Sequence, residues 1–279
     1  MDALVFLGPA LALCLVIASI HVYLGMHVLA REVIFVDLSL AQLAALGATV
    51  AGLVTAEEEP GFRAHATALG FTIVGAAIFA FTRRARRRVS QEAIVGIVYA
   101  VSSAVTVLVV SHSPHGAEHI KDILVGSLLN TTWTNVWQTA AAYAVLGALE
   151  LYFARRFIAI SWHPEEAEKT TRFVELWDLG FYVLFGLVIT ISVRFAGILL
   201  VFSFLIVPAV ITGLFANRLV NRLFMGWGVA IAASGLGIFA SWTWDLPTGA
   251  AIVAAFGALL VLAAIARAAV PTRTTLRIG

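Results

Sequence analysis

The sequence is dominated by apolar runs long enough to cross a lipid bilayer. About 20 consecutive apolar residues span the ~30 Å hydrocarbon core as an α-helix. Because backbone polar groups in lipid must be satisfied within the segment, each run is predicted to be helical. The fold class is therefore an all-α integral membrane protein: a polytopic bundle of about eight or nine transmembrane helices in one domain, residues 1–279. Nine runs are found, at residues 3–24, 33–54, 64–82, 93–110, 132–154, 177–193, 195–216, 223–242 and 247–266.

Composition agrees with this class, since 61% of the residues are hydrophobic and 12% are charged. Soluble domains carry about twice that charged fraction. The single cysteine, Cys14, lies inside an apolar run, so neither a disulfide framework nor a cysteine-based metal site is expected. The start of the chain lacks the basic residues of a cleaved signal peptide, so the first run is predicted to remain as a span.

The orientation follows from the retention of Lys and Arg on the cytoplasmic side of the membrane. With the N-terminus outside, fifteen of the 18 basic residues fall in cytoplasmic segments, and Arg63, Lys121 and Arg194 are the exceptions. The acidic residues 57–59 then face outward and the C-terminus is cytoplasmic. If one run is re-entrant, eight helices remain, those after that run keep this orientation, and the N-terminus moves inside.

The longest cytoplasmic stretch, residues 155–176, is too short for a domain core but has the features of a short helix. Apolar contacts are offered by Trp162, Ala167, Phe173 and Val174. The segment is predicted either to dock with a partner protein or to tie two spans together at the membrane surface. Its charges suit the ends of a helix, with Pro164 at the first position after His163, Glu165 and Glu166 in the first turn, and Lys169 and Arg172 in the last.

Two ionisable residues within the spans are candidates for an ion path, because such groups are costly in lipid. Asp37 lies near the start of the second run and His21 lies in the first. If these runs form a hairpin that turns near residue 29, both residues lie at similar depth. An imidazole and a carboxylate are suitable ligands for zinc, manganese or ferrous iron. A His–Asp hydrogen bond that locks the hairpin is the structural alternative.

Other polar residues in the spans are also candidates to line a path. Gln42 is five residues beyond Asp37, about 140° around the helix, so one helix cannot direct both at one point. The fourth run has a polar face that either lines a path or attaches the helix to a neighbour, formed by Tyr99, Ser102, Ser103 and Thr106. The seventh run is interrupted in a way that indicates a kink, by Ser203, Pro208 and Thr212.

The predicted outward loop at residues 111–119 combines imidazoles with a carboxylate. Such a set can collect a divalent cation at neutral pH. A solvated polar loop without a ligand is the alternative, and the proline and glycine within the loop favour it. The four candidate ligands are His112, His115, Glu118 and His119.

Several enzymatic and nucleotide-binding motifs are absent from the sequence. It contains no G-x-x-x-x-G-K-[ST] phosphate loop, no H-E-x-x-H pair and no G-x-S-x-G nucleophile elbow. The basic cluster at residues 83–88 flanks a span, so topology and anionic lipid explain it without nucleic acid. Any ATP-driven cycle must therefore be powered by another protein.

Three stretches resemble the permeases of zinc, manganese and iron ABC importers: VIFVDLSLAQLAALG at 33–47, IKDILVGSLL at 120–129 and SVRFAGILLVFSFLIVPA at 192–209. The resemblance extends over nearly the whole chain, and the order of its parts fits. It implies a fold similar to cobalamin-importer permeases and a homodimer with the pathway at its interface. It also implies two cytoplasmic ATP-binding subunits, an extracytoplasmic metal-binding receptor and a bacterial plasma (inner) membrane location. The cargo would be zinc or manganese, with iron as a third candidate, and no covalently bound cofactor is expected.

The resemblance also assigns roles to particular residues. Asp37 matches the family's acidic position in the second span, and Pro208-Ala209 matches its Pro-Ala near the end of the seventh. The segment His163–Arg172 matches the one that docks in a groove of the ATPase. Many members carry a histidine a few residues after the acidic position, whereas this sequence has Gln42.

Two other functions compete with an ATP-driven permease. A secondary transporter or channel would need no ATPase, but such carriers often contain internal repeats with matching broken helices, and no convincing repeat is found. An intramembrane metalloenzyme would need a cluster of acid, base or metal ligands, which only His21 with Asp37 approaches.

Overall fold

The computed structural model describes residues 3–55, 62–82, 89–111, 121 and 123–269, and this part of the chain is helical without strands. The acidic residues 57–59, the basic cluster 83–88 and the loop histidines His112, His115 and His119 with Glu118 lie outside the described residues. The helices are α1 (Ala3–Arg31), α2 (Val36–Thr55), α3 (Phe62–Phe81), α4 (Gln91–Val110), η2 (Leu128–Asn130), α6 (Trp133–Trp162), α7 (Pro164–Thr170), α8 (Val174–Phe215), α9 (Leu219–Trp244) and α10 (Thr248–Ala269).

Every predicted apolar run corresponds to a helix or to half of one. Among the described residues, six helices are long and apolar enough to cross a membrane, namely α1, α3, α4, α8, α9 and α10. Helix α2 contains a shorter apolar segment, Val36–Gly52, and α6 is a long helix of lower apolarity. The predicted polytopic helical membrane fold is confirmed.

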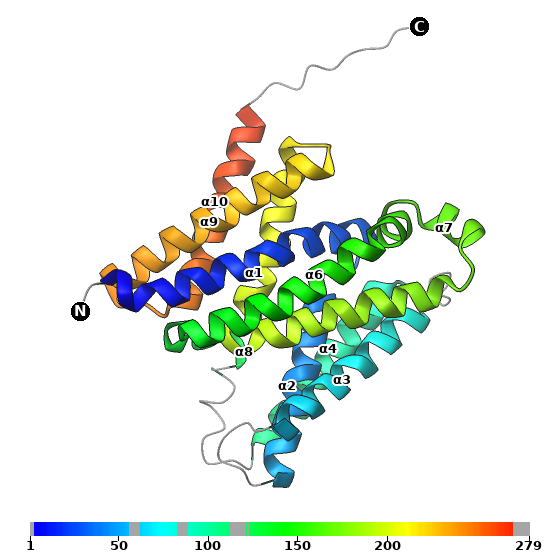
Figure 1. The fold of residues 1–279 in the computed structure, drawn as a ribbon, viewed down its shortest axis with the longest axis horizontal. Helices are drawn as coiled ribbons and strands as arrows, with labels where there is room; N and C mark the ends of the chain where they lie inside the picture. The colour runs from blue at the N-terminus through cyan, green and yellow to red at the C-terminus, as the bar shows by residue number, and fades with distance from the viewer. Residues whose placement is uncertain (1–2, 56–61, 83–88, 112–120, 122, 270–279) are drawn as a thin grey trace, which may run out of the picture.

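Helix α8 has 42 residues and would be about 63 Å long if straight, twice the apolar thickness of a bilayer. Its backbone leaves the helical conformation at Gly197, where φ is 73° and ψ is 165°. The chain changes direction between the lime-green start and the yellow end of α8 (Figure 1). The sixth and seventh predicted runs are therefore the two halves of α8, joined where the sequence predicted a tight link.

Helices α1 and α8 form the centre of the bundle. Helix α1 packs against α6, α8 and α9, while α2, α3 and α4 pack beside one another and α10 pairs with α9 (Figure 1). The crossing of α1 and α8 is close, because a Cβ at Gly25 would collide with the carbonyl oxygen of Leu205. An aromatic cluster fills the core beside this crossing, with Phe157, Phe181 and Phe185 at most 1% exposed.

The outer surface of the bundle carries large apolar side chains. Trp137, Leu151, Tyr152 and Phe239 are each between 66% and 80% exposed. Extended apolar surface of this kind is rare on soluble monomers and is the normal surface of a helix that faces lipid or a partner. The molecule thus exposes large apolar side chains on its outer surface, while polar side chains such as Asp37 and Gln42 are buried between helices.

Candidate functional site

Asp37 is the second residue of α2 and is only 1% exposed. The backbone N–H groups of Asp37 and Leu38, at the start of the same helix, act on its carboxylate without forming a hydrogen bond of normal geometry. Both carboxylate oxygens are buried without a partner in the described residues. A buried carboxylate in this state is costly, so the position of Asp37 favours a further ligand.

Glu92, in the first turn of α4, is the charged side chain whose field acts on Asp37. Its Oε1 accepts a hydrogen bond of 3.2 Å from the N–H of Phe35, two residues before Asp37. Its Oε2 is buried and has no partner among the described residues. Two neighbouring carboxylates repel each other, and a divalent cation bound by their oxygens would remove that repulsion. Sequence reasoning missed Glu92 because it lies one residue before the predicted fourth span.

His21 and Asp37 do not meet as the hairpin geometry predicted. Helix α1 continues to Arg31, so His21 lies ten residues, about 15 Å, before its end, whereas Asp37 lies at the start of α2. The fully buried His21 has Nδ1 2.8 Å from the carbonyl of Ile17 and Nε2 3.2 Å from Ser192 Oγ. The hydrogen bond between His21 and Asp37, which was the structural alternative to metal binding, is therefore not formed. Metal contact by either residue remains a prediction.

Gln42 connects α2 to the polar face of α4, because its Nε2 donates a 3.2 Å hydrogen bond to Thr106 Oγ1. Ser102 and Thr106 are buried, and their hydroxyls also donate to carbonyls one turn earlier in α4. This face therefore attaches α4 to its neighbour, which was one of the two predicted roles. Tyr99 is half-buried, and the buried Ser103 hydroxyl has no partner among the described residues, so a path-lining role for these two stays a prediction.

The interruption in the second half of α8 is less pronounced than the sequence indicated. Ser203 and Pro208 are buried within the helix, and Ser203 Oγ donates 2.9 Å to the carbonyl of Leu199 in the preceding turn. The backbone leaves the helical conformation at Gly197 and not at Pro208. Helix α9 supports this region through Arg222, which donates 3.2 Å to the carbonyl of Ala209.

The break at Gly197 packs against the loop before η2. Gly126 and Gly197 both have positive φ, 72° and 73°, and a Cβ at either would collide with the backbone of the other segment. The N–H of Ser127 donates 3.1 Å to the carbonyl of Phe195 beside this contact. Two of the stretches that carry the family resemblance, 120–129 and 192–209, therefore meet at one point.

The short helix predicted between the fifth and sixth apolar runs is present as α7. Ala167 anchors it by packing with Ile160 and Val174, which keeps the helix against the ends of α6 and α8. Arg172 is not in its last turn as predicted, because α7 ends at Thr170; the Arg172 guanidinium instead lies 4.7 Å from the centre of the next residue's phenyl ring. The other predicted positions are confirmed: Pro164 begins α7, Glu165 and Glu166 lie in its first turn, and Lys169 lies in its last.

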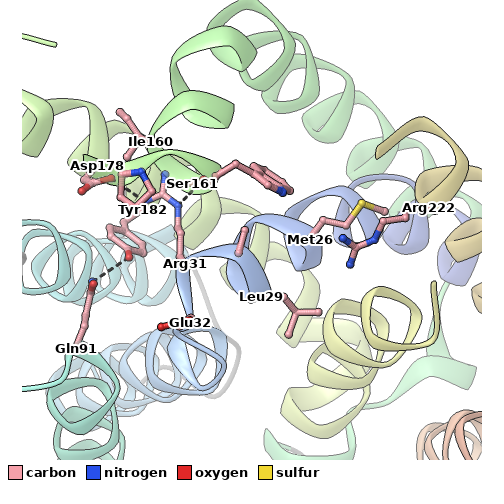
Figure 2. Close-up of a pocket in the computed structure, with 13 residues that line it drawn as sticks. Met26, Leu29, Arg31, Glu32, Gln91, Ile160, Ser161, Asp178, Tyr182 and Arg222 are labelled. Atoms are coloured by element: carbon pink, nitrogen blue, oxygen red, sulfur yellow. Dashed lines mark hydrogen bonds and ion pairs between the residues drawn. The ribbon is translucent and has the colours of Figure 1, made fainter. Parts of the chain in front are cut away.

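A cavity of about 530 Å³ lies where α1 and α6 end and where α7 and α8 begin. On one side, the Arg31 guanidinium forms a buried ion pair of 2.7 Å with Asp178, and Arg31 Nε donates 2.9 Å to Ser161 Oγ. Figure 2 shows Arg222 on the opposite side of the cavity. Pro164, the first residue of α7, also lines it, so α7 borders the same cavity as the ion pair. Sequence reasoning did not consider Asp178, which lies one residue inside the predicted sixth run.

In the part of the chain that the structure describes, no three His, Cys, Asp or Glu side chains lie close enough together to bind one metal ion. At this site, Asp37 and Glu92 would therefore supply only two side-chain ligands. Water or backbone carbonyls would have to complete the coordination of an ion held between them.

The helical bundle, its apolar exterior and its polar contacts between helices define a multi-pass helical membrane protein. The chain belongs to the ABC 3 transport family, whose model matches residues 3–267. The fold is similar to that of PsaBC from Streptococcus pneumoniae, solved in complex with Fab, with a TM-score of 0.77 and 19% identity over 94% of this chain and 93% of that chain.

Two curated relatives indicate the range of cargo among similar proteins. The manganese transport system membrane protein MntC of Halalkalibacterium halodurans is 25% identical over 63% of this chain and 60% of its own length. The chelated iron transport system membrane protein YfeD of Yersinia pestis is 26% identical over 60% of this chain and 56% of its own length. The chain thus spans about three fifths of the length of the curated relatives it matches.

Proposed function

We propose that this chain is the membrane-spanning subunit of an ATP-binding cassette importer that moves a divalent metal ion into the cytoplasm of a bacterium. The observation that carries the proposal is a pair of neighbouring carboxylates at the starts of α2 and α4, the buried Asp37 and the partly buried Glu92. Oxygen atoms without protein partners in a membrane-spanning bundle are suited to an ion that must bind and then leave.

The ligand chemistry favours manganese as the transported ion over zinc, and iron ranks between the two. Carboxylate and water oxygens suit Mn²⁺, whereas zinc sites in proteins use mostly imidazole and thiolate. The one cysteine, Cys14, is buried in α1. The relatives named for manganese and chelated iron transport support the same choice.

The proposed assembly is a homodimer with cytoplasmic ATP-binding subunits and an extracytoplasmic metal-binding receptor. Helix α7 would receive the movement of the ATPase, because Ala167 holds it firmly against Ile160 and Val174. Pro164 would pass that movement to the cavity that contains Arg31 and Asp178. A rigid element that adjoins a buried ion pair is able to transmit displacement rather than absorb it.

The proposal is tested by Mn²⁺ uptake into proteoliposomes that contain the permease, its ATPase and its receptor. Asp37→Asn and Glu92→Gln keep size and hydrogen bonding but remove the charge that a cation needs, so each should reduce ATP-driven uptake about tenfold or more. Asp245→Asn, an exposed carboxylate between α9 and α10, is the matched control and should transport normally. Normal uptake by folded Asp37→Asn would exclude this site, and His21→Ala tests the other predicted ligand in the same assay.

A further inference from the structure

A second cavity, of about 230 Å³, lies between α1, α6 and α9 and is separate from both places described above. Its polar lining comes from three helices and includes Ser19, Tyr23, Tyr143, Glu150 and Trp227. The volume is several times the ~30 Å³ that one water molecule occupies in the liquid. It can therefore hold a small ion together with part of its hydration shell.

Glu150 is the ionisable group of this cavity. It belongs to α6 and is 1% exposed, and both of its carboxylate oxygens are buried without a partner in the described residues. The hydroxyl of Tyr23, from α1, is likewise buried without a partner there and lines the same cavity. Two residues that line this cavity, from two helices, thus carry three buried oxygen atoms without a hydrogen bond to satisfy them. Groups in this state are costly in a membrane and mark sites of function.

The charges around Glu150 do not neutralise it. Arg31 is the positive charge whose field reaches both Glu150 and Tyr23, but Arg31 is already in its ion pair with Asp178. Glu150 itself forms no salt bridge with any other described residue. One helical turn beyond Tyr23, the ring of His27 packs against the tyrosine ring at 4.7 Å and also has a buried nitrogen, Nε2, without a partner.

We propose that this cavity is a second cation site within the membrane, in which Glu150 is the charged ligand and Tyr23 an oxygen ligand for a partly hydrated divalent cation. The site rests on the proposed transport function for the identity of the ion, for which Mn²⁺ is the probe. One carboxylate, one phenol oxygen and retained waters form the oxygen-rich set that Mn²⁺ accepts. A path with two separate stations would hold the ion less tightly at each and allow it to move on.

The experiment measures Mn²⁺ binding to the purified permease in nanodiscs, without ATPase or receptor, from the paramagnetic resonance signal of free Mn²⁺. The Asp37→Asn variant serves as background, so that the remaining binding reports the Glu150 cavity. Adding Glu150→Gln should weaken this binding about tenfold or more, and adding Tyr23→Phe should weaken it by a smaller factor. Adding Asp245→Asn should leave it unchanged.

Binding in the Asp37→Asn background that is unaffected by both Glu150→Gln and Tyr23→Phe would overturn the site, as would no binding in that background at all. Thermal unfolding of each variant confirms that the bundle is intact, and Tyr23→Phe keeps the test valid if Glu150→Gln does not fold. The outcome is distinguishable from that of the transport proposal. Binding that depends on Glu150 in a wild-type protein without ATP-driven uptake would contradict the transport function alone.

Discussion

The guanidinium of Arg31 lies 2.7 Å from the carboxylate of Asp178, and this ion pair connects the end of α1 with the start of α8. Both side chains are at most 5% exposed, and Arg31 also lies 3.9 Å from the centre of the Phe181 ring. The end of α6 joins the same contact through Ser161. Three helices are therefore fixed to one another beside α7.

Asp178→Asn should lower the free energy of unfolding by about 3–5 kcal/mol, because it leaves the buried Arg31 charge without its counter-ion. The measurement is the unfolding of the purified protein in detergent by heat or denaturant. The double variant Arg31→Met/Asp178→Leu removes both charges and should be more stable than the single variant. Equal stability of wild type and Asp178→Asn would mean that the ion pair does not hold these helices together.

Gly197→Ala should destabilise the protein, because its backbone, with φ 73° and ψ 165°, lies in a region essentially restricted to glycine. A Cβ there costs about 1–3 kcal/mol even before it meets the backbone at Gly126. The matched controls are Gly235→Ala in α9 and Gly257→Ala in α10, where an added Cβ meets nothing within 4 Å. These helical positions should become slightly more stable, by up to about 1 kcal/mol. Thermal unfolding of the three variants distinguishes a conformational requirement from a general intolerance of alanine.

Much of the fold could be predicted because lipid permits so few backbone structures. The length of each apolar run determined the helices, and the short polar interruption near Arg194 located the break in α8. Which helix faces meet could not be predicted, because a helix that is apolar all round has no face that the sequence distinguishes. Glu92 was missed because it lies just before a run. Glu150 and Asp178 were missed although each is a carboxylate inside a run, which is itself a usable signal. The depth of His21 was wrong because the turn after α1 lies beyond Arg31.

Thr106→Val should distinguish attachment from path lining on the polar face of α4. The variant keeps the shape of the side chain and removes the hydroxyl that accepts from Gln42 Nε2, so we expect a loss of about 0.6 kcal/mol in stability. If the face only attaches α4 to α2, Mn²⁺ uptake per folded molecule should be unchanged. A large loss of uptake with unchanged stability would instead assign Thr106 to the ion path.

Glu165→Lys combined with Glu166→Lys should weaken association with the ATPase or uncouple ATP hydrolysis from uptake. The substitutions place positive charge at the N-terminus of α7 and reverse the charge of its exposed surface. Pull-down of the ATPase and the ratio of Mn²⁺ transported to ATP hydrolysed are the two measurements. The paired Glu165→Gln/Glu166→Gln variant, which only removes charge, should have a smaller effect. Wild-type values for the lysine variant would make α7 an interfacial tether.

Single cysteines should report the orientation of the bundle. A cysteine replacing Leu246, between α9 and α10, should react with an impermeant thiol reagent from outside the cell. A cysteine replacing Glu168 on α7 should react only after permeabilisation. The native Cys14 is fully buried and should contribute little background. The reverse pattern at both positions would overturn the orientation inferred from the positive-inside rule.

The contact between Gly126 and Gly197 also constrains how the protein is made. The chain between these glycines includes all of α6 and α7, and synthesis proceeds at roughly 5–20 residues per second. For several seconds after Gly126 leaves the ribosome, the backbone around Ser127 therefore lacks the Phe195 carbonyl that it later bonds. Until α8 is inserted, the N–H of Ser127 must be hydrated or shielded by the insertion machinery. Insertion of α8 then supplies the Phe195 carbonyl and completes the packing of the helices that entered the membrane earlier.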